Sequence, residues 1–186
     1  MIDLFIRQAE AVGAECYRLG TRQDAIEAIV ATLQQEGVAD SPGCWAVWAA
    51  DHFLREDERQ QILHSVPGVR FDISRQTAAE ALVGISAMEF GVAQTGTLLS
   101  DSSAVDRRLV STLPPVHIAI LPVSRIVADM ATALSQLDVR RCPFIAAITG
   151  PSRTADIERV LTIGVHGPRK LVILLIEDRA NGGAPQ

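Results

Sequence analysis

Short apolar runs that alternate with segments of helical pattern constrain the fold of this chain most strongly. Such runs are typical of strands that are buried on both faces of a sheet. We expect strands at residues 44–50, 69–73, 116–121, 144–148 and 171–176. We expect helices between them at residues 53–63, 76–83, 104–111, 124–137 and 155–161. This order predicts an α/β fold with a mostly parallel central sheet that is flanked by helices.

Helical periodicity also fills the first forty residues. Thr21 is suited to cap the second of these helices, with Asp24 in the capping position three residues later, and Gly37 ends that helix. A Ser-Pro-Gly break follows at residues 41–43. We therefore expect three parts: an N-terminal helical segment at residues 1–40, one α/β domain at residues 41–178, and a flexible tail at residues 179–186.

Charge and composition narrow the function classes. The net charge of −5 and the 4% aromatic content argue against a basic stripe or a stacking platform for nucleic acid. The amino terminus, MIDLFIRQAE, is acidic where a signal peptide is basic, and no run approaches the roughly 20 apolar residues that cross a bilayer. We expect a cytoplasmic protein without a membrane span. The scattered Cys16, Cys44 and Cys142 lack the spacing of iron–sulfur or structural zinc sites, so we expect no metal in this chain.

The tract TGPSRTAD at residues 149–156 is the first candidate binding site. It follows an apolar run and precedes an expected helix, and in open α/β sheets ligands bind beyond the carboxyl ends of strands. A helix amino terminus would also offer unpaired N–H groups to an anion. The clustered hydroxyls and the guanidinium exceed what capping needs, which favours a small-anion site. The alternative is a well-capped helix with Arg153 solvated or paired to Asp156.

The stretch AQTGT at residues 93–97 is the second candidate. Two threonines that flank Gly96 can present hydroxyls and N–H groups to an anion. Taken alone, a glycine bulge or a close approach of another backbone explains this stretch better. Because each stretch lies at or beside a strand end, our hypothesis is that the two face one shared crevice at the rim of the sheet.

Histidine and arginine supply weaker candidates. His166 lies in a glycine-bounded loop, where it serves either as an acid, base or ligand, or as a hydrogen-bonding group that shapes the turn. Arg107 and Arg108 begin an expected helix. One alternative is that one of these two side chains points toward a bound anion; the other is that both lie at the surface. His117, inside an apolar run, is expected to be a core residue. No nucleophile elbow, P-loop, HExxH or GxGxxG motif is present, so the catalytic residues are unknown.

Three blocks of sequence resemble the lactate utilization protein C family, also called LutC/YkgG, of the LUD-domain group. They are AQTGTLL, RLVSTLPPVHIAILP and TGPSRTADIERVLTIGVHGPRKL, and the resemblance extends from about residue 78 to residue 176. It implies a fold of the NagB/RpiA/CoA-transferase type. It also implies a three-component, iron–sulfur-dependent system that oxidises L-lactate to pyruvate, with the clusters in the two partner subunits. The substrate-binding positions that the resemblance carries over are Thr95, Gly96, Thr97, Arg108, Ser152, Arg153, Thr154, Asp156, His166 and Gly167.

Gln94 departs from the pattern of this family, in which many relatives have an acidic residue and read AETGT. Coenzyme A transferases of the implied fold use a glutamate nucleophile. An amide neither attacks an acyl group nor acts as a general base near neutral pH. Independent acyl transfer is therefore disfavoured, whereas ligand binding within a complex is compatible with the change.

These observations leave more than one function open. The first is an accessory or substrate-handling subunit of a lactate-oxidising complex that binds a small carboxylate or phosphate, with catalysis in this chain left undecided. The second is a free-standing enzyme that acts on a sugar phosphate, an acyl-CoA or a folate-like substrate, and it rests on fold analogy alone. A regulatory ligand-binding module is the third.

Overall fold

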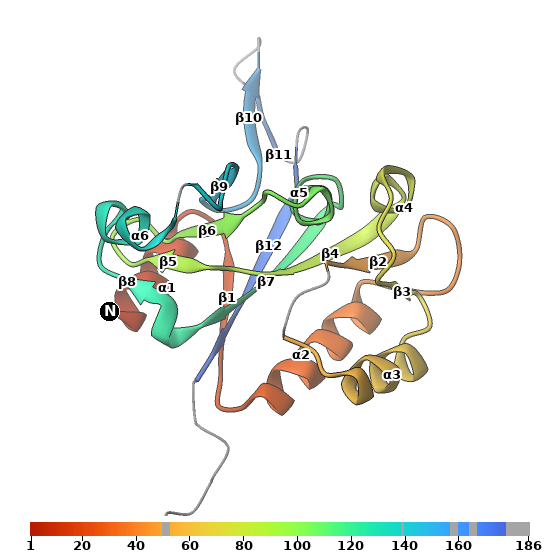
Figure 1. Ribbon diagram of the computed structural model, residues 1–186. Coiled ribbons are helices and arrows are strands. Elements are labelled where there is room, and N and C mark those ends of the chain that lie inside the picture. Colours follow the sequence, from red (N-terminus) through yellow and green to blue (C-terminus); the bar gives the residue numbers. More distant parts are fainter. Residues whose placement is uncertain (50–52, 139, 157–159, 164–166, 178–186) are drawn as a thin grey trace, which may run out of the picture.

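The most continuous apolar runs become neighbouring strands of a parallel sheet (Figure 1). In spatial order the strands are β1 (Glu15–Leu19), β12 (Lys170–Ile176), β7 (Val116–Pro122), β4 (Ala81–Ala87), β2 (Trp45–Trp48) and β3 (Val69–Arg70), and all pairings are parallel. β7 and β12 are buried over nearly their whole length, as strands covered on both faces are. The expected fold class is confirmed. The computed structural model describes residues 1–49, 53–138, 140–156, 160–163 and 167–177, and of residues 153–156 and 160–163 it describes the backbone only.

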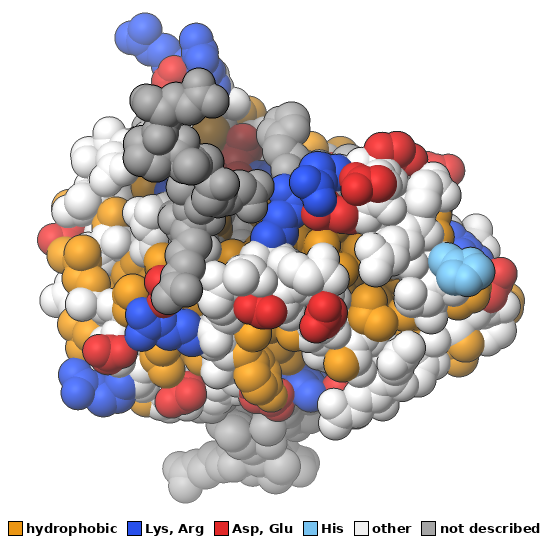
Figure 2. All heavy atoms as spheres, turned by 90° about the horizontal axis from the view of Figure 1, so that it is seen from below, with side chains coloured by type: hydrophobic (Ala, Val, Ile, Leu, Met, Phe, Trp, Pro, Cys, Tyr) orange, Lys and Arg blue, Asp and Glu red, His pale blue; other side chains and the backbone are white. Residues whose placement is uncertain are grey.

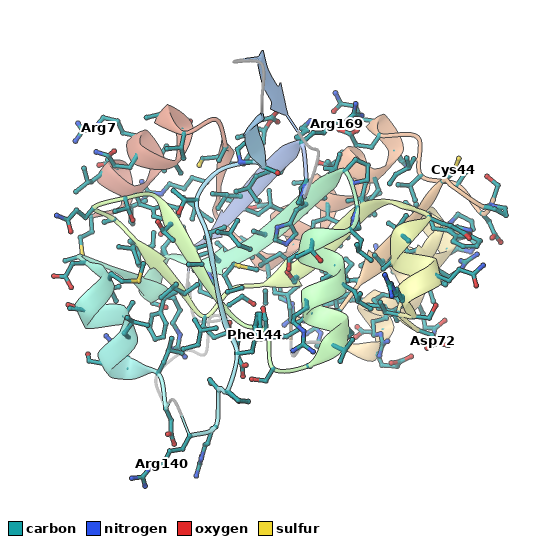
Figure 3. The ribbon with its side chains drawn as sticks, turned by 90° about the horizontal axis from the view of Figure 1, so that it is seen from above. Arg7, Cys44, Asp72, Arg140, Phe144 and Arg169 are labelled. Atoms are coloured by element: carbon teal, nitrogen blue, oxygen red, sulfur yellow. The ribbon has the colours of Figure 1, made fainter. Side chains whose placement is uncertain are left out.

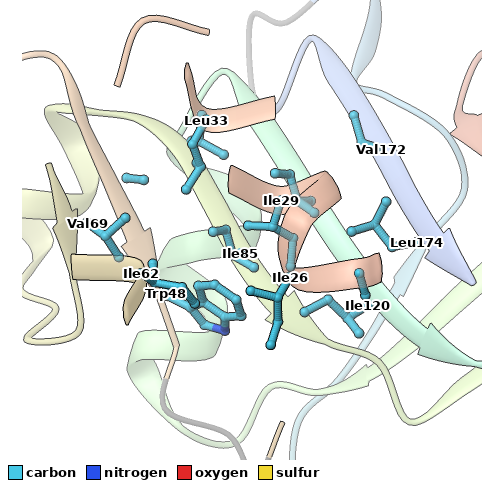
Figure 4. Packing of buried hydrophobic residues seen from close by; sticks show 14 of the residues in the cluster. Ile26, Ile29, Leu33, Trp48, Ile62, Val69, Ile85, Ile120, Val172 and Leu174 are labelled. Atoms are coloured by element: carbon cyan, nitrogen blue, oxygen red, sulfur yellow. The ribbon is translucent and has the colours of Figure 1, made fainter. Parts of the chain in front are cut away.

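Two of the described helices cover one face of this sheet, and the others lie on its other side. The helices described are α1 (Ile2–Ala11), α2 (Arg22–Gln35), α3 (Glu56–Ser65), α4 (Arg75–Ala79), α5 (Val105–Thr112) and α6 (Met130–Gln136). Ile29 and Leu33 of α2 and Ile62 of α3 pack with Trp48 and Ile120 of the sheet (Figure 4), and none of these side chains is more than 1% exposed. Burial of large apolar side chains contributes about 1.5–3 kcal/mol each, so this cluster is a main source of stability.

The opposite face carries α1 and a second sheet. This sheet has the order β8 (Ile126–Val127), β5 (Phe90–Val92), β6 (Thr97–Asp101) and β9 (Ile145–Ile148). Phe5 of α1 and Leu98 of β6 belong to one buried cluster with Leu121 and Leu171 of the central sheet. The domain therefore has a central sheet between a layer of two helices and a mixed layer of helices and strands (Figure 1).

The start of α2 follows the sequence expectation, whereas β1 was missed. The Thr21 hydroxyl accepts a bond from the Asp24 N–H (3.1 Å), and the Asp24 carboxylate accepts one from the Thr21 N–H (2.9 Å). β1 is an edge strand without a fully buried residue, so it produces no apolar run. The division of the chain at residue 40 stays a prediction, and residues 179–186 lie outside the described residues.

β4 corrects the expected helix at residues 76–83. Helix α4 ends at Ala79, and the strand begins at Ala81. Gly84 interrupts the apolar pattern because α5 packs directly on it: a Cβ at this position would lie 1.9 Å from the carbonyl oxygen of Val110. The glycine is required for packing and does not end the strand.

The expected helix from residue 124 or 125 to 137 is only partly formed. A 3-10 turn, η1 (Val123–Arg125), leads into β8, and α6 begins after Asp129. The Asp129 carboxylate accepts a hydrogen bond from the Thr132 N–H at 2.7 Å, which caps the helix. This internal cap is the sequence signal that places the helix start, at Met130, five or six residues later than expected.

The expected helix at residues 155–161 is wrong. The chain instead forms the antiparallel strands β10 (Arg153–Asp156) and β11 (Val160–Ile163), which pair with each other and project beyond the central sheet (Figure 1). The β-branched residues of this segment favour strands, and they outweigh the weak helical spacing of its apolar positions.

The helices and the surface charge have one notable property each. None of the described helices is long and apolar enough to cross a membrane. On the face shown in Figure 2, acidic and basic side chains are interspersed, so this face presents no extended patch of one charge.

Candidate functional site

The two candidate stretches meet through a chain of three hydroxyls. Thr95 Oγ1 lies 2.7 Å from Thr97 Oγ1, which lies 2.8 Å from Thr149 Oγ1. Thr97 starts β6 and Thr149 follows β9, and these strands pair antiparallel with Leu98 opposite Ile148. This pairing brings together residues that are 52 positions apart in the sequence. The stretches are therefore adjacent. A crevice that both of them face, and ligand binding by them, stay predictions.

A tight turn and the end of α1 hold this arrangement. Gly96 has φ +67°, and its N–H donates to the carbonyl of Val92 at 2.9 Å. A Cβ at Gly96 would lie 2.3 Å from the backbone nitrogen of Ala9, so the close approach suggested by the sequence is made by α1. Gly150 has φ +73°, and a Cβ there would lie 2.5 Å from the carbonyl oxygen of Val12. The carboxyl end of α1 thus contacts the central glycine of each stretch.

One hydroxyl proton of the threonine chain is not used in its two internal hydrogen bonds. Three hydroxyls carry three protons, and the two bonds of the chain consume two of them. When Thr95 donates to Thr97 and Thr97 donates to Thr149, the remaining proton belongs to Thr149, whose side chain is exposed. An anion beside Thr149 would favour this orientation, because it accepts the outward hydrogen bond.

A cleft of about 330 Å³ lies next to Thr149. One wall is formed by Thr149 and Ser152, and the other by Gly167 and the end of α5 at Thr112. The Ser152 N–H donates to the carbonyl of Pro168 at 2.8 Å, which ties the two loops together. A Cβ at Gly167 would lie 3.2 Å from the Cβ of Ser152, so a larger residue would crowd this serine.

The position of this cleft differs from the expected one. Pro168, which lines the cleft, lies two residues before β12, and the N–H of the following Arg169 donates to the carbonyl of Pro115, the residue before β7. The cleft therefore lies at the amino ends of these central strands. The strand that ends at Thr149, β9, belongs to the second sheet. Because a strand follows Ser152, no helix amino terminus faces the cleft there, and the helix end that does line it is the carboxyl end of α5, whose dipole disfavours an anion. An anion would therefore depend on hydroxyls and side-chain cations.

Arg108 has a structural role in the loop between β6 and α5. Its guanidinium donates to the carbonyls of Ser102 (2.6 Å) and Ser103 (3.1 Å) and lies 5.1 Å from the ring centroid of Phe144 (Figure 3). It is not among the residues that line the cleft. The structure therefore does not bring Arg108 to the threonine chain.

Several other predicted site residues lie, wholly or by their side chains, outside the described part of the chain. The side chains of Arg153, Thr154 and Asp156, and all of His166, belong to the part of the chain that is not described. Their roles stay predictions.

Sequence reasoning missed three residues in or beside the cleft: Ser111, Thr112 and Arg169. Ser111 and Thr112, at the end of α5, line it, and their hydroxyls donate to α5 carbonyls while their oxygens can still accept. Arg169 follows Pro168 directly, is exposed, and supplies a cation near the cleft (Figure 3). The sequence signal was the position of Arg169 after the glycine-bounded loop.

Comparison with known proteins places the chain in a family. The family model of the LUD domain matches residues 2–176. The chain belongs to the LUD domain family. Lactate utilization protein C of Halalkalibacterium halodurans is 31% identical over 169 residues, which cover 86% of this chain and 72% of that protein. The resemblance seen in the sequence is therefore confirmed.

Further relatives show how much of each protein is shared. Proteins with the same name from Bacillus licheniformis and Bacillus subtilis are 40% and 43% identical, over 58% and 55% of this chain. The matched parts are 48% and 45% of those proteins, so the chain spans about half of their length. A crystal structure of a DUF162 family protein from Deinococcus radiodurans has a TM-score of 0.65 and 18% identity, covering 94% of this chain and 95% of that one. It shows the same fold.

A buried polar pair lies beneath α5 in this LUD domain. His117 is 0% exposed, as expected of a core histidine, and its Nε2 lies 2.9 Å from the Ser86 hydroxyl. Its Nδ1 has no hydrogen-bond partner within the described part of the chain. Burial lowers the pKa of His117 from 6.5 to about 4, so the imidazole is neutral at physiological pH.

The thiols of the LUD domain form no disulfide and no metal-binding cluster among the described residues. Cys16, Cys44 and Cys142 are all free, and among the described residues no three His, Cys, Asp or Glu side chains are close enough to hold a metal ion. Burial and the nearby Glu10 raise the pKa of Cys16 to about 12, which keeps this thiol protonated.

Proposed function

We propose that this LUD domain is a substrate-handling component of a lactate utilization system and binds a small carboxylate, L-lactate or pyruvate, in the cleft beside Thr149. The contact between Thr97 and Thr149 carries the proposal, because it links the 93–97 stretch to Thr149, which lines the cleft. Relatives that bear the name lactate utilization protein C supply the substrate class.

The chemistry of the cleft matches a hydroxy acid or keto acid. The outward proton of Thr149 and the hydroxyl of Ser152 are donors for a carboxylate. Arg169 adds a positive charge next to the loop that ends at Pro168. Gln94, exposed beside Thr95, is neutral, so it does not repel an anion as the acidic residue of many relatives would.

The redox chemistry belongs to other subunits in this proposal. Oxidation of lactate to pyruvate releases two electrons and two protons, and an electron acceptor must take the electrons. We place that acceptor in iron–sulfur partner subunits, and this chain positions the carboxylate. The resemblance to the lactate utilization family supports this division of labour.

A genetic and biochemical experiment tests the proposal. Deletion of the gene in its host is expected to abolish growth on L-lactate, and the wild-type gene is expected to restore growth. Ser152→Ala should restore it poorly, and Ser135→Ala, on the exposed face of α6, should restore it fully. Affinity purification of the tagged protein should recover partners that contain iron and acid-labile sulfide.

Two outcomes would contradict the proposal. One is normal growth of the deletion strain on L-lactate. The other is turnover of a sugar phosphate or an acyl-CoA by the purified chain alone, which would favour a free-standing enzyme.

A further inference from the structure

A second cleft lies at the opposite edge of the central sheet. Adjacent parallel strands β4 and β7 both end there, with Ala87 opposite Ile120. Met88 follows β4 and Pro122 ends β7, and both line a cleft of about 380 Å³. The carboxyl ends of parallel strands are where open α/β sheets bind ligands. We call this cavity the carboxyl-edge cleft.

The floor of the carboxyl-edge cleft is apolar, and of its two acidic lining residues Glu89 is neutralised, while Asp138 lies beside Arg141. Met88 and Phe90 are each only 4% exposed. The Glu89 carboxylate accepts a bond from the Arg107 guanidinium at 2.5 Å through one oxygen and from the Asp101 N–H at 2.5 Å through the other. Its negative charge is therefore compensated within the protein.

The rim of the carboxyl-edge cleft is cationic. Arg125 lines it, and its guanidinium lies 5.7 Å from the ring centroid of Phe90. No ion pair of Arg125 forms with any residue that the structure describes. Arg141 is paired with Asp138 at 3.5 Å, but its side chain is 88% exposed, where such pairs are weak. The charge that remains uncompensated at the rim is the positive charge of Arg125.

We propose that the carboxyl-edge cleft is a second binding site that takes an organic anion with an apolar or aromatic body. The body would lie on Met88 and Phe90, and the anionic group would bind Arg125. A three-carbon acid has no such body, so this ligand is chemically distinct from the one proposed at the cleft beside Thr149, which we call the threonine cleft. The two sites lie at opposite ends of the central strands, and one can fail without the other.

Cys142 makes the site testable, because its half-buried thiol lines the same cleft. The probe is 1-anilinonaphthalene-8-sulfonate, an anion with an aromatic body, and its fluorescence reports binding. We expect one bound probe per chain, displaced by aromatic carboxylates and not by L-lactate. Bound probe should slow alkylation of Cys142 by iodoacetamide and leave the rate at Cys44, which lies elsewhere, unchanged.

Matched variants locate the anionic contact. Arg125→Gln is expected to weaken probe binding about tenfold, because a charge-assisted contact is lost. Arg140→Gln should leave binding unchanged, because Arg140 is exposed and points away from the domain (Figure 3). Thr97→Val should also leave it unchanged, which separates this site from the threonine cleft. Equal affinity of the Arg125→Gln variant, or no protection of Cys142 in the wild-type protein, would overturn the proposal.

Discussion

Thr97 is the residue on which the threonine cleft depends most directly. Its hydroxyl is buried and bonds to hydroxyls from two separate parts of the sequence. A buried hydroxyl in this position orders its neighbours, because the direction of one bond decides the direction of the other. Thr149 can then present a donor toward a ligand only while Thr97 accepts from Thr95.

The substitution Thr97→Val tests the chain of three hydroxyls, because valine has nearly the same shape as threonine but carries no hydroxyl. Loss of two hydrogen bonds should lower the free energy of unfolding by about 1–2 kcal/mol and weaken L-lactate binding roughly tenfold. Urea unfolding and calorimetric titration measure the two effects. Thr32→Val is the control, because the Thr32 hydroxyl bonds only to a carbonyl of its own helix. Equal lactate affinity of wild type and Thr97→Val would show that the chain has no part in binding.

His117 predicts a dependence of stability on pH. An unfolded histidine takes up its proton near pH 6.5, whereas the folded one does so only near pH 4. Between these values the unfolded state binds more protons, so acidification favours unfolding, by about 3 kcal/mol once the pH falls through 4. Above pH 6.5 this contribution to stability is fully present.

His117→Gln removes the titrating group. The difference in free energy of unfolding between wild type and variant, measured in urea at pH 7 and pH 4, should change by about 3 kcal/mol in favour of the variant at the lower pH. A difference that stays constant with pH would show that His117 is not buried in the neutral form.

Helix α1 is the element that joins the two candidate stretches. It contacts Gly96 and Gly150 by backbone atoms, and its Phe5 side chain is buried in the core. Because backbone atoms make these contacts, the side chains of α1 give no sign of them in the sequence. The glycines reveal them, since each lacks the Cβ that would collide with the helix.

Gly150→Ala should therefore destabilise the protein more than Gly43→Ala. Both glycines have positive φ, +73° and +82°, so both changes cost roughly 1–2 kcal/mol of backbone strain. At Gly43 nothing lies within 4 Å of the new Cβ, whereas at Gly150 the Val12 carbonyl lies 2.5 Å away. We expect an additional loss of about 1–3 kcal/mol for Gly150→Ala, measured by urea unfolding. Equal losses would mean that α1 does not press on this loop.

Elements with a strong local signal were predictable from the sequence. β7 and β12 read as continuous apolar runs because both of their faces are covered, and α2 begins at a complete capping box. β1 and β8 were not predictable, because an edge strand and a two-residue strand leave no periodic pattern. The hairpin of β10 and β11 was mistaken for a helix because its apolar residues also fit a helical spacing.

At the scale of the whole molecule, the site depends on a long-range pairing. The sequence indicated both hydroxyl-rich stretches, yet their contact arises from the pairing of β6 with β9, and no spacing along the chain encodes it. The second sheet was missed as a separate sheet for the same reason: the strand expected at residues 144–148 forms as β9, but it pairs with β6 and not within the central sheet. The carboxyl-edge cleft likewise combines residues from β5, β7, η1 and α6, which carry no common motif.

Ligand binding should be visible as a change in global stability. At a hundred times its dissociation constant, L-lactate should add about 2.7 kcal/mol to the free energy of unfolding and raise Tm by roughly 5–10 °C. Differential scanning fluorimetry measures the shift, with D-gluconate as a bulky hydroxy acid that the cleft should bind less well. An unchanged Tm with L-lactate, pyruvate and phosphate would contradict an anion site at the threonine cleft.

The most direct measurement is a crystal structure of the protein soaked with L-lactate. We predict a lactate carboxylate within hydrogen-bond distance of the Thr149 and Ser152 hydroxyls, between the end of α5 and Gly167. An empty threonine cleft at saturating lactate, or lactate bound at Arg125 instead, would contradict the account.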